Sequence, residues 1–396
     1  MIYDSLDLES ILKDFPVTRK ITYMNNGSLA PLPLSSIKAM TDFLIRYSEL
    51  GPDSSTIQEH IVSLMKETRI RLGHLINSEP EEIVFTQSTT EGLNYVSTGL
   101  NWKESDILVI RGGPHEHYAN YFPWLNVANK FKVKIKELKI DNNGFFDLDE
   151  LERIAKSSNI KLITLSHALY NNGAILPVEE VGKIAQDNDI LLCIDAAQSV
   201  GSIDVDVKRI NCDFMAFPSF KWVCGPPGTG IFFCKKKSAS LLEPKYIGNE
   251  SAIITEKKEL VFLDSPKKFQ TGFRNYVGLA GFEASLRYIL RLGINTVRKM
   301  NISVANQLRN ELSKIPSIQF FGPDNEKTRT SIISFTIDGV ESKTIVSKLE
   351  EKEIIVAERE IHIDKRLIKI VRLSPHFFNS YDEISKLVRE LQIISK

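Results

Sequence analysis

The sequence predicts an α/β fold with a mainly parallel sheet, because short apolar runs alternate with segments of helical periodicity. Runs typical of buried strands lie at 83–86, 107–110, 133–138, 160–165 and 191–194. Apolar residues recur at helical spacing in 55–77, 147–156 and 178–188. Consecutive parallel strands need crossover connections, so we expect helices on both faces of this sheet.

A second, smaller α/β unit is predicted in the last third of the chain. A helical pattern spans 277–314, with a break near Gly293, and leads out of the large domain. Further strand and helix patterns follow at 331–337, 343–352, 354–357, 368–373 and 381–394, the last with Ser380 as its N-cap. We expect an N-terminal arm at 1–20 that packs with the small domain, a large domain at 21–276, and a linking helix with the small domain at 277–396.

Composition excludes several classes of partner. The 396 residues hold 50 lysines and arginines and 50 aspartates and glutamates, so net charge gives no attraction for nucleic acid or an anionic membrane. No apolar run approaches the roughly 20 residues that span a bilayer. The first residues show no secretory signal. We therefore expect a cytoplasmic protein.

The cysteines do not suggest a metal site. Cys193, Cys212, Cys224 and Cys234 lack the close pairing of zinc ligands, so no metal is expected. Three of them lie in or beside apolar strand-like runs, which predicts buried thiols.

An acid and a lysine follow two consecutive strand-like runs. Asp195 ends the run 191–194, and an acid at the carboxyl end of a buried strand points into the crevice where open α/β sheets bind ligands. Lys221 follows the run 214–217 and lies beside Trp222. Desolvation by aromatic neighbours lowers the pKa of a lysine and makes its amine a usable nucleophile.

This pair matches the needs of pyridoxal phosphate. That cofactor requires a Schiff-base lysine and an acid that keeps the pyridine nitrogen protonated. Gln198, three residues after Asp195, can donate to the phenolic oxygen of the ring. Taken singly, Asp195 as a helix cap and Lys221 as a surface charge would be the simpler interpretation, but that interpretation leaves the order of the features unexplained.

The chain resembles the class V aminotransferase family of fold-type I pyridoxal-phosphate enzymes. Within that family it is most similar to the branch of cysteine desulfurases, C–S lyases and isopenicillin N epimerases. The resemblance runs from about Tyr23 to the C-terminus and rests on Lys221-Trp222 and the glycine-rich turn Gly225–Gly230. It implies a large domain with a seven-stranded-type sheet between helices, a small C-terminal α/β domain, and a homodimer.

The resemblance places the cofactor phosphate at Thr89 and Thr90. They lie in a Ser88-x-x-Glu91 capping-box pattern, whose free N–H groups and helix dipole suit a phosphate. An ordinary capped helix would explain this motif if it stood alone.

The resemblance also assigns groups around the cofactor ring. His117 corresponds to the histidine that stacks on the ring, with His115 as a competitor that could suggest a metal pair. Asn171 follows a predicted strand at a position where the family has a polar residue near the phenolic oxygen or the substrate.

Arginines are the expected carboxylate ligands. The resemblance assigns Arg372 to the substrate α-carboxylate, with Arg359 as a second candidate, because a guanidinium binds a carboxylate through two parallel hydrogen bonds. Asn26 and Gly27 correspond to the loop that lines the substrate pocket.

Two departures from desulfurases concern the phosphate. Thr271 and Gly272 resemble the segment that reaches the neighbouring subunit's cofactor, but Phe273 replaces the usual threonine. Pro218 replaces a phosphate-binding serine, for which Ser219 is expected to compensate.

A third departure concerns sulfur chemistry. Desulfurases keep a nucleophilic cysteine on a small-domain loop, near 357–366 here, and no cysteine follows Cys234. We therefore expect cysteine desulfurase-like or C–S lyase chemistry without a small-domain persulfide. An aminotransferase or an amino-acid epimerase would share every residue named above.

Two hypotheses of other classes are weaker. A non-catalytic fold-type I scaffold would not need both Lys221 and Asp195. A nicotinamide dehydrogenase would need a Gly-x-Gly-x-x-Gly turn after its first strand, and none is visible.

Overall fold

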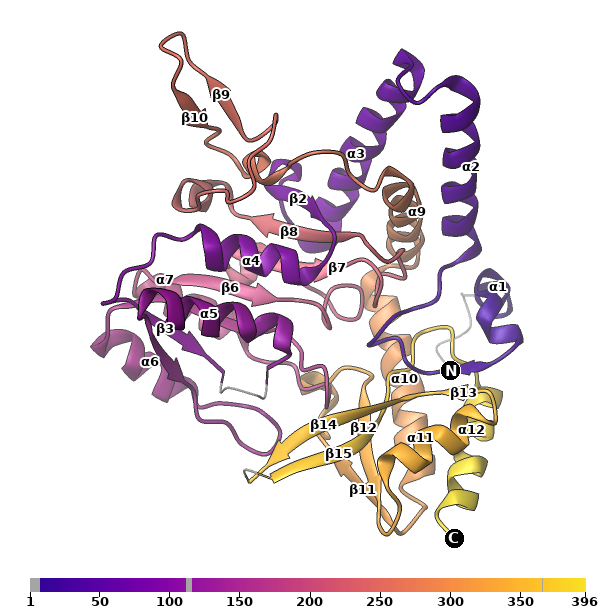
Figure 1. Ribbon diagram of the computed structural model, residues 1–396. Helices are drawn as coiled ribbons and strands as arrows, with labels where there is room; N and C mark the ends of the chain where they lie inside the picture. Colours follow the sequence, from indigo (N-terminus) through magenta and orange to yellow (C-terminus); the bar gives the residue numbers. More distant parts are fainter. Residues whose placement is uncertain (1–7, 112–115, 365) are drawn as a thin grey trace.

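The computed structural model describes residues 8–111, 116–364 and 366–396 (Figure 1). Its central sheet has seven strands in the order β2-β8-β7-β6-β5-β3-β4. Their bounds are β2 Ile83–Thr86, β3 Ile107–Ile110, β4 Lys134–Glu137, β5 Ile160–Ser166, β6 Leu191–Asp195, β7 Phe214–Pro218 and β8 Gly230–Cys234. Only β8 runs against its neighbours in this described sheet, so the predicted mainly parallel sheet is confirmed.

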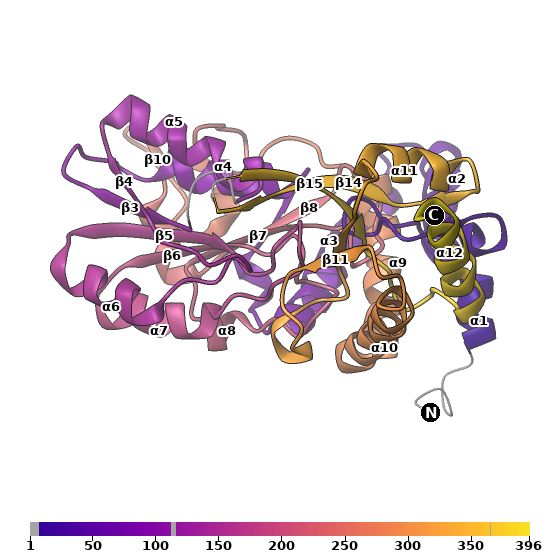
Figure 2. The same ribbon diagram turned by 90° about the horizontal axis from the view of Figure 1, so that it is seen from below.

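Helices cover both faces of this sheet, as the strand residues require. On β7, Phe214 and Ala216 enter one apolar core, and Met215 and Phe217 enter the other. Figure 2 shows α4 and α5 on one side of the sheet and α6, α7 and α8 on the other. The helices of this layer are α3 Ser55–Ile76, α4 Thr89–Gly99, α5 Phe122–Phe131, α6 Leu148–Ser157, α7 Val178–Asp187 and α8 Val207–Ile210.

The small C-terminal unit is a four-stranded antiparallel sheet in the order β11-β12-β15-β14. Its strands are β11 Ile318–Phe321, β12 Ile333–Ile337, β14 Ala357–Ile363 and β15 Arg366–Leu373, and its helices are α10 Ile294–Leu312, α11 Ser342–Glu350 and α12 Tyr381–Ile394. α12 has the predicted bounds, and Ser380 caps it by accepting from the Glu383 N–H.

The long helix of the prediction is two helices. α9 Tyr276–Leu292 ends at Gly293, whose φ of 79° breaks the helix before α10 begins. The predicted loop at 357–366 is wrong, because residues 357–363 form β14. Ile361 is buried there and pairs with Ile368 of β15, which gives this segment a reason to be extended.

The N-terminal segment packs against the C-terminal unit. After α1 Leu8–Asp14, the Phe15 ring stacks on Phe378 with centroids 4.3 Å apart. β1 Thr22–Tyr23 then pairs in parallel with β13 Ile354–Ile355. Residues 1–7 of the predicted arm lie outside the described part of the chain.

Several elements were not predicted, among them α5 and β11. α2 Leu34–Leu50 stands beside α3 at the upper right of Figure 1, and a hairpin of β9 Ala252–Ile254 and β10 Leu260–Phe262 projects from the same edge of the large domain at its upper left. Short 3-10 turns complete the chain at Pro16–Arg19, Pro80–Glu82, Tyr118–Asn120, Lys236–Leu241, Pro266–Phe269 and Glu326–Thr328. None of the described helices has the length and apolarity to cross a bilayer.

Candidate active site

A cavity of about 310 Å³ lies where the central strands end. β5, β6 and β7 run in parallel, and their register sets Ser166 beside Asp195 and Asp195 beside Ala216. The carboxyl edge of such a sheet is where α/β folds bind ligands. The charged and polar lining residues are Ser28, Ser88, Thr89, Thr90, His117, Ser166, Tyr170, Asp195, Gln198, Lys221, Arg359 and Arg372.

Asp195 is buried at this cavity, and Lys221 is partly buried there. Burial raises the pKa of Asp195 to about 6. Two groups act in the opposite direction and lower it: the Ala197 N–H, which donates to Oδ1 at 2.9 Å, and Lys221. Burial lowers the pKa of Lys221 to about 8; Asp195 raises it, and Arg372 lowers it further. A neutral amine is therefore available near physiological pH, as the sequence predicted.

The loop that carries Lys221 is fixed by hydrogen bonds on several sides. The Trp222 Nε1–H donates to Gln198 Oε1 at 2.8 Å, and Gln198 Nε2 donates to the Gly27 carbonyl at 2.9 Å. His376 Nε2 lies 3.0 Å from the Trp222 carbonyl. The amide of Gln198 thus links Trp222 to Gly27, and its NH₂ keeps a second N–H for a ligand.

The first turn of α4 presents Ser88, Thr89 and Thr90 to the cavity. Ser88 caps the helix by accepting from the Glu91 N–H at 3.3 Å. The reciprocal bond of the predicted capping box is not formed, because the Glu91 carboxylate accepts from the Gln87 N–H at 2.7 Å. The free N–H groups of a helix start favour an anion here.

His117 presents a neutral ring to the cavity. Its Nδ1 accepts from the Ala119 N–H at 3.2 Å, and its ring meets Tyr170 edge-on, with centroids 5.1 Å apart. Burial, then Lys221 and the nearby arginines, lower the pKa of His117 to about 4. His115 lies outside the described residues. Within 8–111, 116–364 and 366–396 there is no group of three or more His, Cys, Asp or Glu that could hold a metal.

Two arginines from the small unit face the cavity. Arg372 is 1% exposed and donates to the Tyr170 carbonyl at 2.8 Å, to Asn25 Oδ1 at 3.0 Å and to Ser28 Oγ at 2.7 Å. Arg359 also donates to Ser28 Oγ. Neither guanidinium forms an ion pair with a described carboxylate, and burial lowers the pKa of both. No described carboxylate therefore balances the two guanidinium charges at this end of the cavity.

Several predicted residues do not line the cavity. Asn26 donates to the Ser374 carbonyl at 2.9 Å, and Asn171 donates to the Glu360 carbonyl at 3.1 Å. Thr271, which precedes Gly272 in the chain, lines a separate cavity of about 280 Å³.

Ser219 was expected to replace the phosphate-binding serine that is Pro218 in this chain. The structure does not place Ser219 among the residues that line this cavity. Its hydroxyl donates to the Pro226 carbonyl at 2.7 Å and contacts Thr229, so it holds the glycine-rich turn. Pro218 itself lines the cavity.

Sequence reasoning gave no role to Ser166 or Tyr170, and it placed Ser28 only in the loop expected to line the substrate pocket. Ser28 bridges both arginines, and Tyr170 touches both His117 and Arg372. The one available signal was position, because Ser166 and Tyr170 follow a predicted strand and Ser28 follows Gly27.

The aminotransferase class-V family matches residues 22–387. The chain belongs to this family. It is 31% identical to a probable cysteine desulfurase of Methanothermobacter thermautotrophicus and 30% identical to one of Pyrococcus abyssi, over 98% of every chain. A cysteine desulfurase from Thermococcus onnurineus superposes with a TM-score of 0.89 at 28% identity, over 98% of both chains. The cystine C–S lyase C-DES superposes with a TM-score of 0.85 at 25% identity, over 96% of this chain and 99% of that one.

As a member of the class-V family, the protein is an enzyme, and its cofactor is pyridoxal phosphate. The donor set of the cavity fits this cofactor. A buried amine suits its aldehyde, a buried carboxylate suits its ring nitrogen, and a helix start suits its phosphate. The solved structures that superpose on this chain also confirm the predicted fold, that of the fold-type I pyridoxal-phosphate enzymes.

Proposed function

We propose that the enzyme cleaves the carbon–sulfur bond of a cysteine derivative by β-elimination. The observation that carries this is a cavity in which Lys221, whose pKa burial lowers to about 8, lies with two arginines that have no described carboxylate partner, and in which no cysteine is among the described lining residues. The names of the matched relatives, cysteine desulfurase and cystine C–S lyase, support a sulfur substrate.

The cofactor site follows from the residues of the large domain. Bound pyridoxal phosphate supplies the electron sink for the carbanion at the substrate α-carbon. We propose that Lys221 carries it as a Schiff base and Asp195 hydrogen-bonds its ring nitrogen. His117 lies against the ring, and Thr89 and Thr90 hold the phosphate.

The reaction needs one base and one anion site. Arg372 holds the α-carboxylate through paired hydrogen bonds, and Lys221 takes the α-proton. The carbon–sulfur bond breaks, and its electron pair leaves with the sulfur. With cystine and one water, the products are cysteine persulfide, pyruvate and ammonia.

A good leaving group is required because the protein offers no thiol to accept sulfur. No cysteine follows Cys234 in the sequence, and all four cysteines are buried. A disulfide or sulfoxide substrate expels sulfur more readily than cysteine itself, since low-pKa leaving groups depart faster.

The test is a product analysis of the yellow holoenzyme. Cystine, cysteine, a cysteine sulfoxide and alanine are supplied separately, and sulfur products, pyruvate and loss of chirality are each measured. Pyruvate with sulfur release from cystine is expected. A keto acid formed one for one with aminated cofactor would instead show an aminotransferase, and racemisation alone would show an epimerase.

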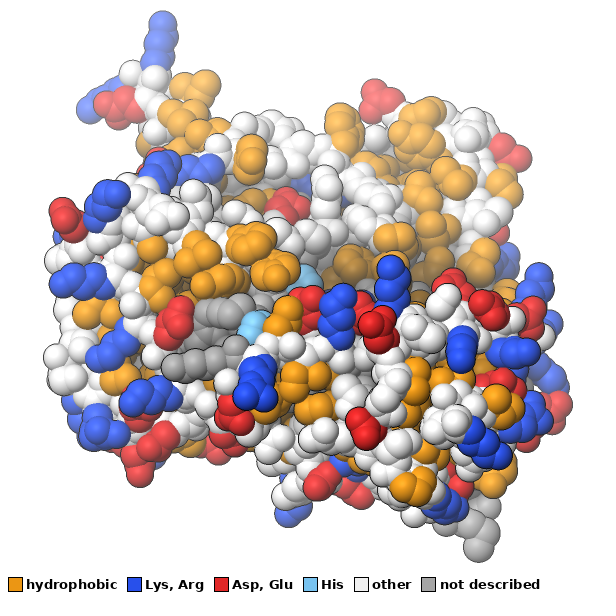
Figure 3. All heavy atoms as spheres, turned by 60° about the horizontal axis from the view of Figure 1, so that its bottom comes forward, with side chains coloured by type: hydrophobic (Ala, Val, Ile, Leu, Met, Phe, Trp, Pro, Cys, Tyr) orange, Lys and Arg blue, Asp and Glu red, His pale blue; other side chains and the backbone are white. Residues whose placement is uncertain are grey.

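We also propose a homodimer. Large apolar side chains are exposed on α2, on α3, at the β9–β10 hairpin and at Phe273, which is 91% exposed. Figure 3 shows hydrophobic surface over the α2–α3 edge and at the hairpin. In such a dimer, Thr271 and Gly272 would serve the neighbour's phosphate. A monomer in sedimentation that binds cofactor and turns over substrate would contradict this.

The remaining assignments are proposals of the same kind. Domains at 21–276 and 277–396 divide where α9 begins, with the arm at 1–20 on the small domain. Four free thiols favour a reducing compartment, which supports the cytoplasm.

A further inference from the structure

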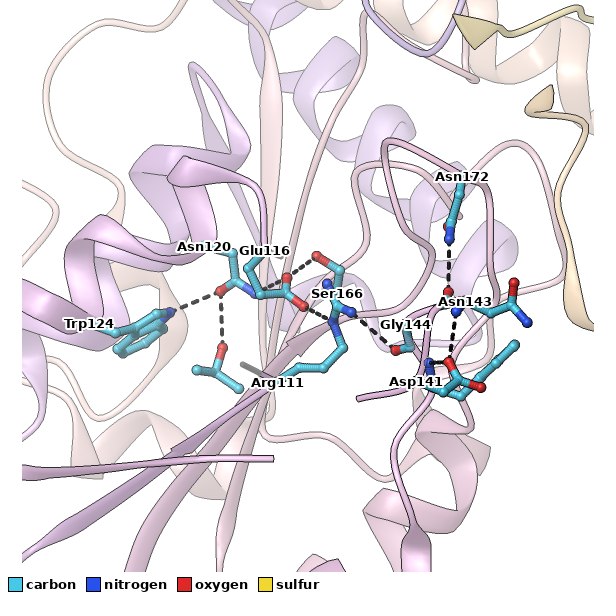
Figure 4. Close-up of polar contacts among 11 residues, drawn as sticks. Arg111, Glu116, Asn120, Trp124, Asp141, Asn143, Gly144, Ser166 and Asn172 are labelled. Carbon is cyan, nitrogen blue, oxygen red and sulfur yellow. Dashed lines mark hydrogen bonds and ion pairs between the residues drawn. The ribbon is translucent and has the colours of Figure 1, made fainter. Parts of the chain in front are cut away.

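A pair of opposite charges lies buried next to His117 in the chain. Arg111 directly follows β3, and Glu116 directly precedes His117. Arg111 Nε lies 2.6 Å from Glu116 Oε1, and the two side chains are 1% and 0% exposed (Figure 4). Neither residue lines the cavity.

The Glu116 carboxylate accepts hydrogen bonds from several elements. Arg111 donates to Oε1, while the Ser166 hydroxyl and the Asn120 amide donate to Oε2, the latter at 3.2 Å. Asn120 Oδ1 accepts in turn from Trp124 Nε1 at 2.9 Å. The carboxylate therefore joins the ends of β3 and β5 to the start of α5 (Figure 4).

Stability alone does not account for this arrangement. The desolvation of two charges offsets most of their attraction, so a buried ion pair contributes little net stability. The pair does supply a fixed geometry, because each hydrogen bond to Glu116 restricts the position of the next residue in the chain, His117.

Glu116 is adjacent to two groups of the cofactor site. It is the chain neighbour of His117, and its partner Ser166 lies beside Asp195 in the β5–β6 register. A shift of the Glu116 carboxylate would move the His117 ring directly and would loosen Ser166 next to Asp195.

We propose that Glu116 is a positioning residue, held by Arg111, which fixes the His117 ring against the cofactor. The inference rests on the cofactor contact of His117 proposed above. It adds a residue that acts through His117 rather than by touching the cofactor.

The experiment measures cofactor binding. Apoprotein of wild type, Glu116→Gln, His117→Ala and the double variant is titrated with pyridoxal phosphate, and the dissociation constant and visible circular dichroism are recorded. Glutamine has one acceptor oxygen, so it can accept from Ser166 and Asn120 only by turning its NH₂ toward Arg111, and it removes the negative charge that faces Arg111. We expect Glu116→Gln to weaken binding about tenfold and to change the dichroism. In the His117→Ala background the same change should weaken binding less than about twofold.

A matched control uses a second ion pair, which joins the starts of β3 and β5. Asp106, just before β3, lies 2.9 Å from Lys161 at the start of β5, at the opposite edge of the sheet. Asp106→Asn should lower the melting temperature while the cofactor dissociation constant and dichroism stay at wild-type values.

Equal weakening by Glu116→Gln in both backgrounds would show a general structural role and overturn the proposal, as would unchanged cofactor binding. If Glu116→Gln does not fold, Asn120→Ala removes one donor to Glu116 and should weaken binding about threefold, again only when His117 is present. The readout does not use carbon–sulfur cleavage, so failure of the proposed reaction leaves this test intact.

Discussion

The two walls of the cavity differ in how their charges are balanced. In the large domain, Asp195 faces Lys221 in the cavity lining, and outside that lining Glu116 is paired with Arg111. In the small unit, Arg359 and Arg372 face the cavity from the antiparallel pair β14–β15 with no described carboxylate partner. The first wall is complete before any substrate arrives. The second wall is complete only when an anion binds.

The largest expected effect comes from removing the lysine of the large-domain wall. Lys221→Ala should lower turnover by roughly 10³-fold or more, because it removes the group that moves the proton. Borohydride reduction should no longer fix the cofactor to the protein, whereas wild type should yield a labelled Lys221 peptide by mass spectrometry. Label on another lysine in wild type would contradict the assignment.

The next effect comes from the second wall. Arg372→Ala should raise KM for amino acids at a cost of about 2–5 kcal/mol, with the absorbance of bound cofactor nearly unchanged. Arg359→Ala should have a smaller effect, since Arg359 is the less buried of the two. Steady-state kinetics on both variants check this ranking. A larger loss from Arg359→Ala would assign the carboxylate to Arg359 instead.

A smaller effect should appear in the titration of Lys221 in the apoprotein. Asp195 raises the pKa of Lys221, while Arg372 and Arg359 lower it. Asp195→Asn should therefore move the midpoint below 8, and Arg372→Gln should move it upward. The pH dependence of reductive methylation at Lys221, read by peptide mass spectrometry, measures both. Unchanged midpoints would show that the charges of Asp195 and Arg372 do not affect the pKa of Lys221.

The smallest expected effect is that of the cysteines. Replacing Cys193, Cys212, Cys224 or Cys234 singly with alanine should leave turnover largely intact wherever the protein folds, because none lines the cavity. Lost turnover in a folded, cofactor-loaded variant, with a persulfide trapped on that cysteine in wild type, would refute elimination to a free sulfur product.

The first wall was largely predictable from sequence because its parts are local. Asp195, Gln198 and Lys221 lie on consecutive elements, so strand ends and spacing place them. Arg372 required the family resemblance, since a lone arginine after a strand carries no signal of its own. Ser219 lies outside the cavity lining because its buried hydroxyl, just after β7, bonds to the Pro226 carbonyl and Thr229 of the glycine-rich turn.

Other misses have physical causes. α2 buries only Ser36 and Phe43, so its apolar pattern gives little periodicity. The β9–β10 hairpin has no buried residue and hence no core-facing pattern. Glu116 looks like a surface acid in sequence, and only the fold shows that Arg111 and Ser166 meet it.

The buried thiols have a consequence for oxidative stress. Peroxide and alkylating agents react with accessible thiolates, and burial raises the pKa of all four cysteines. A desulfurase that depends on an exposed cysteine loses its acceptor once that sulfur is oxidised to a sulfinic or sulfonic acid. This chain has no such sulfur to lose, so its chemistry is suited to persist under oxidants that would silence a thiol-dependent enzyme.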